Sequence, residues 1–240
     1  MSYIITPQYE LLLKVTNSAE PTVIFITGPV GCGKSALLKA WEDSTGRAIE
    51  TAGSREALLK DAVTVKFKVE SLDREMVEIL KESLTPRSVV FVVATEEGRY
   101  GHDQLPFDQL PEAWKEAFTH VVEVDYLENQ KEVELLVSRT GIEADDATKL
   151  VDIASCVRRN WFTRRDMFSS PMSTRRLLVV AKCLKMIGME GLRSTLANLY
   201  SAKGGLRESE RSSIIQYIKG KWGTIWPSER HSEKETPRKK

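Results

Sequence analysis

Residues 22–35 read Thr-Val-Ile-Phe-Ile-Thr-Gly-Pro-Val-Gly-Cys-Gly-Lys-Ser, and this stretch decides the fold. Its first six residues form an apolar run that predicts a buried strand. The remainder has the pattern G-x-x-x-x-G-K-S and leads into Ala-Leu-Leu-Lys-Ala-Trp, which predicts a helix over 34–43. A strand, a glycine-rich turn and a helix in this order are typical of a phosphate-binding loop. A surface turn that matches the pattern by chance is the alternative, and both flanking elements argue against it.

The chemistry of the loop predicts a nucleotide site. Glycines let the backbone approach phosphate oxygens without a Cβ clash, and the amides at the start of a helix favour anions. Lys34 supplies a positive charge for the β- and γ-phosphates, and the hydroxyl of Ser35 can ligate Mg²⁺. The predicted binding residues are Gly28, Pro29, Val30, Gly31, Cys32, Gly33, Lys34, Ser35 and Ala36.

Composition fits an ordinary globular protein of 240 residues, with 41% hydrophobic and 29% charged residues. No apolar run is long enough for a membrane span, and residues 1–7 have no basic, signal-like character. Cys32, Cys156 and Cys183 are far apart, which argues against a disulfide framework and a zinc site. We therefore expect a cytoplasmic protein in a reducing compartment that does not engage membranes.

The net charge of +1 hides an uneven distribution. Residues 1–155 contain 16 Lys and Arg against 27 Asp and Glu, whereas residues 156–240 contain 19 against 7. The basic third can therefore meet a polyanion such as nucleic acid, or dock on the acidic part of a neighbouring copy.

Strand and helix patterns alternate up to residue 124, and only helix patterns follow. Strands are predicted at 22–27, 47–51, 63–69, 88–94 and 121–124, and helices at 8–15, 34–43, 54–60, 73–83, 111–118 and 129–139. Further helices are predicted at 145–158, 173–187, 190–200 and 209–221. This order predicts an α/β domain with a parallel sheet flanked by helices over 1–140 and a small all-α domain over 141–224. Residues 225–240 are expected to form a disordered basic tail.

An α/β nucleotide domain followed by a helical lid resembles the AAA+ ATPases among the P-loop NTPases. Residues 90–142 look like that family's sensor-1 strand and the segment after it. Ser-Pro-Met-Ser-Thr-Arg-Arg-Leu-Leu at 170–178 resembles its sensor-2 motif, and Glu-Ser-Glu-Arg at 208–211 has the same character. The nearest group is the MoxR-type and cobaltochelatase-small-subunit (AAA_5) group. The resemblance covers about residues 4–222 and implies ATP, Mg²⁺ and assembly with other copies or with a partner AAA+ subunit.

The Walker B motif that this resemblance implies departs from the family pattern. At its expected place after the third strand the chain has Glu70 and Ser71, where the family has a metal-binding Asp and a catalytic Glu. Glu70 can still reach the metal's water shell, but Ser71 cannot act as a general base. A second alignment makes Glu96 and Glu97 the Walker B pair. The first alignment fits the downstream sensor-1 match better, and it places Glu97 at the position of the sensor-1 Asn.

The arginines that this resemblance implies are only partly present. Ala117 stands where the family has its arginine finger, and the nearby Lys115 lacks the planar fork of arginine. Arg175 occupies the sensor-2 position, from which it can reach the γ-phosphate; the alternative is a solvated arginine at a helix start. The predicted catalytic residues are Lys34, Glu70, Glu97 and Arg175, with Ser35 and Glu70 as metal ligands.

Two further features leave alternatives open. Residues 158–165, Arg-Arg-Asn-Trp-Phe-Thr-Arg-Arg, can clamp phosphates and stack bases, or can be a lid loop with packed aromatics. Cys32 lies beside Lys34 at a helix start, which predicts a lowered thiol pKa and allows redox control, although a passive small residue is the simpler interpretation.

Three functions fit the sequence. The first is an ATP-binding AAA+ protein of an oligomeric assembly, with weak hydrolysis of its own. The second is a nucleic-acid-associated ATPase such as a replication or recombination loader. The third, a small-molecule kinase, is disfavoured because no dense arginine cluster faces Ser35.

Overall fold

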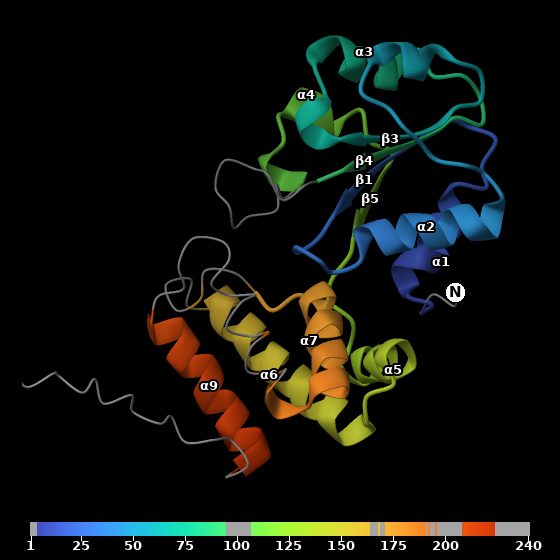
Figure 1. Ribbon diagram of the computed structural model, residues 1–240. Helices are drawn as coiled ribbons and strands as arrows, with labels where there is room; N and C mark the ends of the chain where they lie inside the picture. Colours follow the sequence, from blue (N-terminus) through green and yellow to red (C-terminus); the bar gives the residue numbers. More distant parts are fainter. Residues whose placement is uncertain are drawn as a thin grey trace, which may run out of the picture.

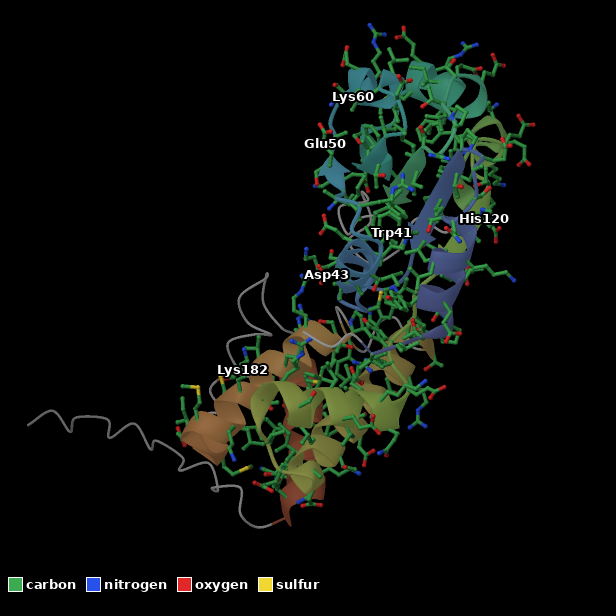
Figure 2. All side chains as sticks on the ribbon, turned by 90° about the vertical axis from the view of Figure 1, so that its right-hand side faces the viewer. Trp41, Asp43, Glu50, Lys60, His120 and Lys182 are labelled. Carbon is green, nitrogen blue, oxygen red and sulfur yellow. The ribbon has the colours of Figure 1, made fainter. Side chains whose placement is uncertain are left out.

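The structure is a computed structural model, and it describes residues 4–94, 107–163, 168, 171–190, 192, 195 and 208–223. The described chain forms an α/β layer and a group of helices beneath it (Figure 1). Figure 2 shows Trp41 within the α/β layer and Lys182 on the exterior of the helical group. Within the described residues, no helix combines the length and apolar character that a membrane span requires.

The α/β layer contains a parallel sheet, as predicted. Its order is β2-β3-β4-β1-β5, and every paired neighbour is parallel. The strands are β1 (Thr22–Thr27), β2 (Glu50–Thr51), β3 (Thr64–Lys68), β4 (Val89–Val93) and β5 (His120–Glu123). Parallel pairing brings the carboxyl ends of all strands to one edge. The segment that follows β1 therefore lies between those that follow β4 and β5.

Two apolar cores cover the two faces of the sheet. The alternation of side chains along β1 places Val23 and Phe25 in one core and Ile24 and Ile26 in the other. The helices α3 (Arg74–Glu82) and α4 (Glu112–Lys115) lie over the first core, together with the 3₁₀ turns η1 (Arg55–Leu59), η2 (Val69–Ser71) and η3 (Phe107–Gln109). The helices α1 (Pro7–Val15) and α2 (Lys34–Thr45) cover the second (Figure 1). Burial on both faces explains why β4 and the four central residues of β1 are apolar.

The helix starts differ in part from the prediction. The order Thr6-Pro7 predicts a helix cap at Thr6, and Thr6 caps α1 by accepting a hydrogen bond from the Tyr9 amide at 3.3 Å. For the helix predicted at 73–83 the sequence favours Ser71 as the cap, and this prediction is wrong, because Asp73 caps α3 by accepting from the Met76 amide at 2.8 Å. Ser71 instead donates to the Lys68 carbonyl at 2.6 Å, which closes the turn after β3.

The helical group shares one core of its own. It contains α5 (Asn129–Thr140), α6 (Ala144–Thr163), α7 (Thr174–Ile187) and α9 (Glu208–Trp222), and the core includes Leu136, Leu150, Leu177, Ile218 and Trp222. Because α5 packs in this core, the predicted domain boundary at 140/141 falls after a helix of the helical group. Most of the predicted helix at 190–200 and the whole tail at 225–240 lie outside the described residues.

Candidate nucleotide-binding site

The turn between β1 and α2 adopts the backbone shape that its glycines allow. Gly28, Gly31 and Gly33 have φ of 147°, 68° and 119°, a region that side chains with a Cβ rarely enter. Helix α2 begins directly after Gly33, so its first amides face the turn. Backbone amides at the start of a helix favour anions, so this geometry is compatible with the predicted phosphate-binding loop, which stays a prediction.

Lys34 points back over the turn. Its ammonium group donates to the carbonyl oxygens of Gly28 at 2.5 Å and Pro29 at 3.2 Å. Ser35 and Ala36, the next residues of α2, are exposed to solvent. The oxygens of a triphosphate are stronger acceptors for an ammonium group than neutral carbonyls. A triphosphate bound at this loop would therefore replace the carbonyls of Gly28 and Pro29 as acceptors of the Lys34 ammonium.

The helical group contacts the phosphate loop. A Cβ added to Gly31 would lie 2.6 Å from the Cβ of Ser173 and 3.6 Å from that of Arg175. Ser173 caps α7 by accepting from the Arg176 amide at 3.3 Å. The start of α7 thus lies against the middle of the turn (Figure 1). The same contact brings the Cβ of Arg175 close to the predicted phosphate-binding loop. The Arg175 side chain is exposed.

Comparison with known proteins identifies one matching family and several similar structures. Residues 132–208 match the family described as CbbQ/NirQ/NorQ C-terminal. Among solved structures, the Holliday junction branch migration motor RuvB of Thermotoga maritima is similar, with 15% identity and a TM-score of 0.57 over 90% of this chain and 76% of that chain. A variant of the same motor has 17% identity and a TM-score of 0.55 over 89% and 75%. No curated protein matches.

The chain has the AAA+ ATPase fold. The predicted resemblance is confirmed, and the match over 132–208 agrees with the MoxR-type group. At this identity the likeness to RuvB concerns the fold alone.

The third strand of the AAA+ fold leads to Glu70, the first Walker B candidate. Glu70 lies in η2, directly after β3, and its side chain is exposed. Glu96 and Glu97, the alternative pair, lie outside the described residues. The choice between Glu70 and Glu97 stays a prediction.

The arginine-finger position of the AAA+ fold holds no cation. Ala117 is buried in the core under α4, where its methyl group packs among apolar side chains. Lys115 pairs with Glu112 at 3.0 Å. A lysine held by a neighbouring carboxylate is a poor substitute for a planar guanidinium.

Four polar side chains meet where the α/β layer and the helical group, the two units of the fold, adjoin, and the sequence did not predict this cluster. It consists of Tyr126, Glu132, Arg158 and Thr174, which come from four separate places in the chain. Tyr126 donates to the carbonyl of Val30 in the phosphate loop at 2.9 Å. A lone Glu in an amphipathic helix and an Arg in a basic run give no signal of pairing, so the sequence could not have revealed it.

The interpretation of residues 158–165 as a clamp for nucleic acid is weakened. These residues continue α6 up to Thr163 and do not form a loop there. Arg158 is bound to a buried carboxylate, and Trp161 is only 8% exposed in the helical core. Arg159 and Phe162 are exposed, and Arg164 and Arg165 lie outside the described residues.

The pKa of Cys32 differs from the prediction. Burial raises the pKa of the Cys32 thiol, and the nearby ammonium of Lys34 opposes this effect without overcoming it. A buried thiol with a raised pKa is a poor nucleophile, which favours the passive role over redox control.

We expect Cys32 to react with iodoacetamide at pH 7 more slowly than Cys183, which is partly exposed. Its thiol is mostly protonated at this pH, and the surrounding core limits access. Mass spectrometry of peptides from a time course measures both rates in one sample. Faster labelling of Cys32 than of Cys183 would contradict this account.

Proposed function

We propose that the chain binds ATP with Mg²⁺ between the phosphate loop and the first turn of α7. The observation that carries the proposal is the position of Lys34, whose ammonium lies over the turn formed by Gly28, Gly31 and Gly33. The close approach of Ser173 to Gly31 also supports the proposal, because a glycine without a Cβ lets the phosphate loop pack directly against the start of α7.

The proposed roles follow from residue chemistry. The loop amides and Lys34 hold the phosphates, and Ser35 supplies a hydroxyl for Mg²⁺. Glu70 or Glu97 supplies the carboxylate near the metal's water shell, and Arg175 closes on the γ-phosphate from α7. The described residues contain no group of three His, Cys, Asp or Glu that could hold a metal. Such a set is not needed where Mg²⁺ shares its ligands with phosphate and water.

We propose further that the chain works with other copies or with a partner AAA+ subunit in a remodelling assembly. Surface charge supports this, since Arg159, Arg175 and Lys182 are exposed on the helical group and Glu78 and Glu82 on α3. The unpaired thiols of Cys32, Cys156 and Cys183 suit the cytoplasm. We propose that ATP binding changes the angle between the α/β layer and the helical group, as domain closure around a ligand commonly does.

Hydrolysis by the isolated chain is expected to be slow, below about 1 s⁻¹. Ser71 cannot activate water, and Ala117 offers no charge to a phosphoryl transition state. A phosphate-release assay on the purified chain tests this, paired with mass photometry with and without ATP. Turnover at ordinary ATPase rates would defeat the prediction, and a failure to bind ATP would defeat the function.

A nucleic-acid-associated ATPase is the second candidate. The observation in its favour is the pair of exposed side chains Arg159 and Phe162, with Phe162 52% exposed at the end of α6. The similar structure of RuvB, a branch migration motor, is in line with it. Affinity for single-stranded DNA that falls steeply with salt would favour this candidate, and weak binding that is insensitive to salt would leave the first.

A further inference from the structure

Tyr126 connects the phosphate loop to the helical group. Its hydroxyl donates to the Val30 carbonyl at 2.9 Å, and burial raises the pKa of Tyr126, so the hydroxyl stays protonated as a donor. A trans peptide is planar, with its carbonyl and amide hydrogen pointing in opposite directions. By holding the Val30 carbonyl, Tyr126 therefore fixes the direction of the Gly31 amide, one of the amides of the phosphate loop.

Arg158 stacks on the face of the Tyr126 ring and links it to the helical group. Its guanidinium carbon lies 3.9 Å from the ring centroid, within cation–π range. The same guanidinium donates to both carboxylate oxygens of Glu132, at 2.7 and 2.8 Å, and to the Met172 carbonyl at 2.8 Å. Arg158 is 6% exposed and Glu132 is fully buried. Arg158 therefore ties α6 to α5 and to the segment that precedes α7.

Thr174 links Glu132 to the start of α7, which lies against the phosphate loop. Its hydroxyl donates to a carboxylate oxygen of Glu132 at 2.6 Å. Thr174 is the first residue of α7 and follows Ser173, which lies against Gly31. These contacts run from Val30 through Tyr126, Arg158, Glu132 and Thr174, and they return to the loop where Ser173, the neighbour of Thr174, lies against Gly31.

We propose that Tyr126, Arg158, Glu132 and Thr174 form a relay that couples the conformation of the phosphate loop to the first turn of α7. Tyr126 is then a positioning residue for the loop. The proposal deepens the nucleotide-binding function and rests on it for its biological meaning. A shift of the Val30 peptide alters the hydrogen bond to Tyr126, and the ring cannot move without disturbing the guanidinium stacked on it.

Burial makes this relay stiff. A buried ion pair is tolerated only where nearly all its hydrogen bonds are satisfied, and loosening one partner leaves a charge without compensation. Small rearrangements are therefore costly, and the relay favours discrete arrangements of loop and helix. Coupling between two sites is also reciprocal, so a change at α7 must affect the loop as strongly as the reverse.

Hydrogen exchange of the nucleotide-free chain of 240 residues tests this reciprocity. Tyr126→Phe removes one hydroxyl and keeps the ring, and we expect exchange to rise about 2- to 10-fold in residues 32–38 and also in residues 176–180. Thr174→Val removes the hydroxyl on the helical side, and we expect a similar rise in residues 32–38, in the other unit. Exchange changes confined to the neighbours of each substitution would overturn the proposal.

Matched controls separate coupling from general loosening. Tyr217→Phe and Thr148→Val remove hydroxyls that bond to Asn160 at 3.0 Å and to the Ala144 carbonyl at 2.8 Å, away from the relay. Neither should change exchange in residues 32–38, and equal effects from control and relay variants would also overturn the proposal.

A second exchange experiment compares the unmodified chain and Tyr126→Phe in the presence of saturating ATP. ATP should slow exchange in residues 176–180 of the unmodified chain, and Tyr126→Phe should lose most of this slowing at an ATP concentration that a binding titration shows to saturate the variant. Full slowing in the variant would count against the relay. If the unmodified chain does not bind ATP, the proposed function fails, while the nucleotide-free exchange still decides whether the two units are coupled.

Discussion

Replacing Lys34 with alanine is expected to weaken ATP binding about a hundredfold or more, which amounts to its loss at ordinary assay concentrations. The ammonium lies over the loop and contacts the carbonyls of Gly28 and Pro29, within reach of any phosphate that binds at the loop. Charge-assisted hydrogen bonds contribute about 1.5–3 kcal/mol each, and one lysine can make two of them to a triphosphate. A fluorescent ATP analogue titrated against both proteins measures the change.

Lys39→Ala is the matched control for this variant. Lys39 lies on the same helix and pairs with Glu42 at 2.7 Å and Asp43 at 3.1 Å, and its side chain is 64% exposed. Its loss should leave ATP affinity within about twofold, because exposed pairs contribute little. Far-UV circular dichroism of both variants checks that they are folded. Unchanged binding in Lys34→Ala would remove the basis for the proposed site.

The sheet was predictable because its signals are local. β1 and β4 are apolar on both faces, which in a chain that alternates strands and helices indicates buried parallel strands. The glycine pattern after β1 has a backbone requirement that few other arrangements share, and the positive φ angles of Gly28, Gly31 and Gly33 meet it. The sheet and the phosphate loop could thus be predicted from local sequence patterns and their order along the chain.

The start of α3 shows where local signals stop being sufficient. Ser71 and Asp73 are both good caps and stand two residues apart, so sequence alone cannot rank them. The 3₁₀ turn after β3 decides the matter, because it uses the Ser71 hydroxyl to bond the Lys68 carbonyl. That turn depends on how β3 ends in the sheet, which is tertiary information.

The junction between the two units was beyond prediction for a stronger reason. Glu132 and Arg158 lie 26 positions apart, and each looks like an ordinary charged residue on a helix. Arg158 also belongs to a run of arginines and aromatics that suggests a surface for nucleic acid. Only the packing of α5 against α6 shows that its guanidinium points inward, so residues that connect domains are the hardest to find in a single sequence.

Replacing Arg158 with methionine is expected to lower the free energy of unfolding by about 3–5 kcal/mol. Methionine fills much of the same space but leaves the fully buried Glu132 carboxylate without its counter-charge and without two hydrogen bonds. The Met172 carbonyl also loses its donor. Urea denaturation followed by far-UV circular dichroism measures the change through the shift of the midpoint.

Two further variants identify the cause of this loss. Arg159→Met changes the neighbouring exposed arginine and should alter stability by less than about 0.5 kcal/mol. Arg158→Met combined with Glu132→Leu removes both charges and should recover at least half of the loss, since apolar replacement of a buried pair is often tolerated. Recovery stays incomplete because Thr174 and Met172 still lack their partners. A double variant no more stable than the single one would show that the cost is one of packing, and the relay would then lose its electrostatic basis.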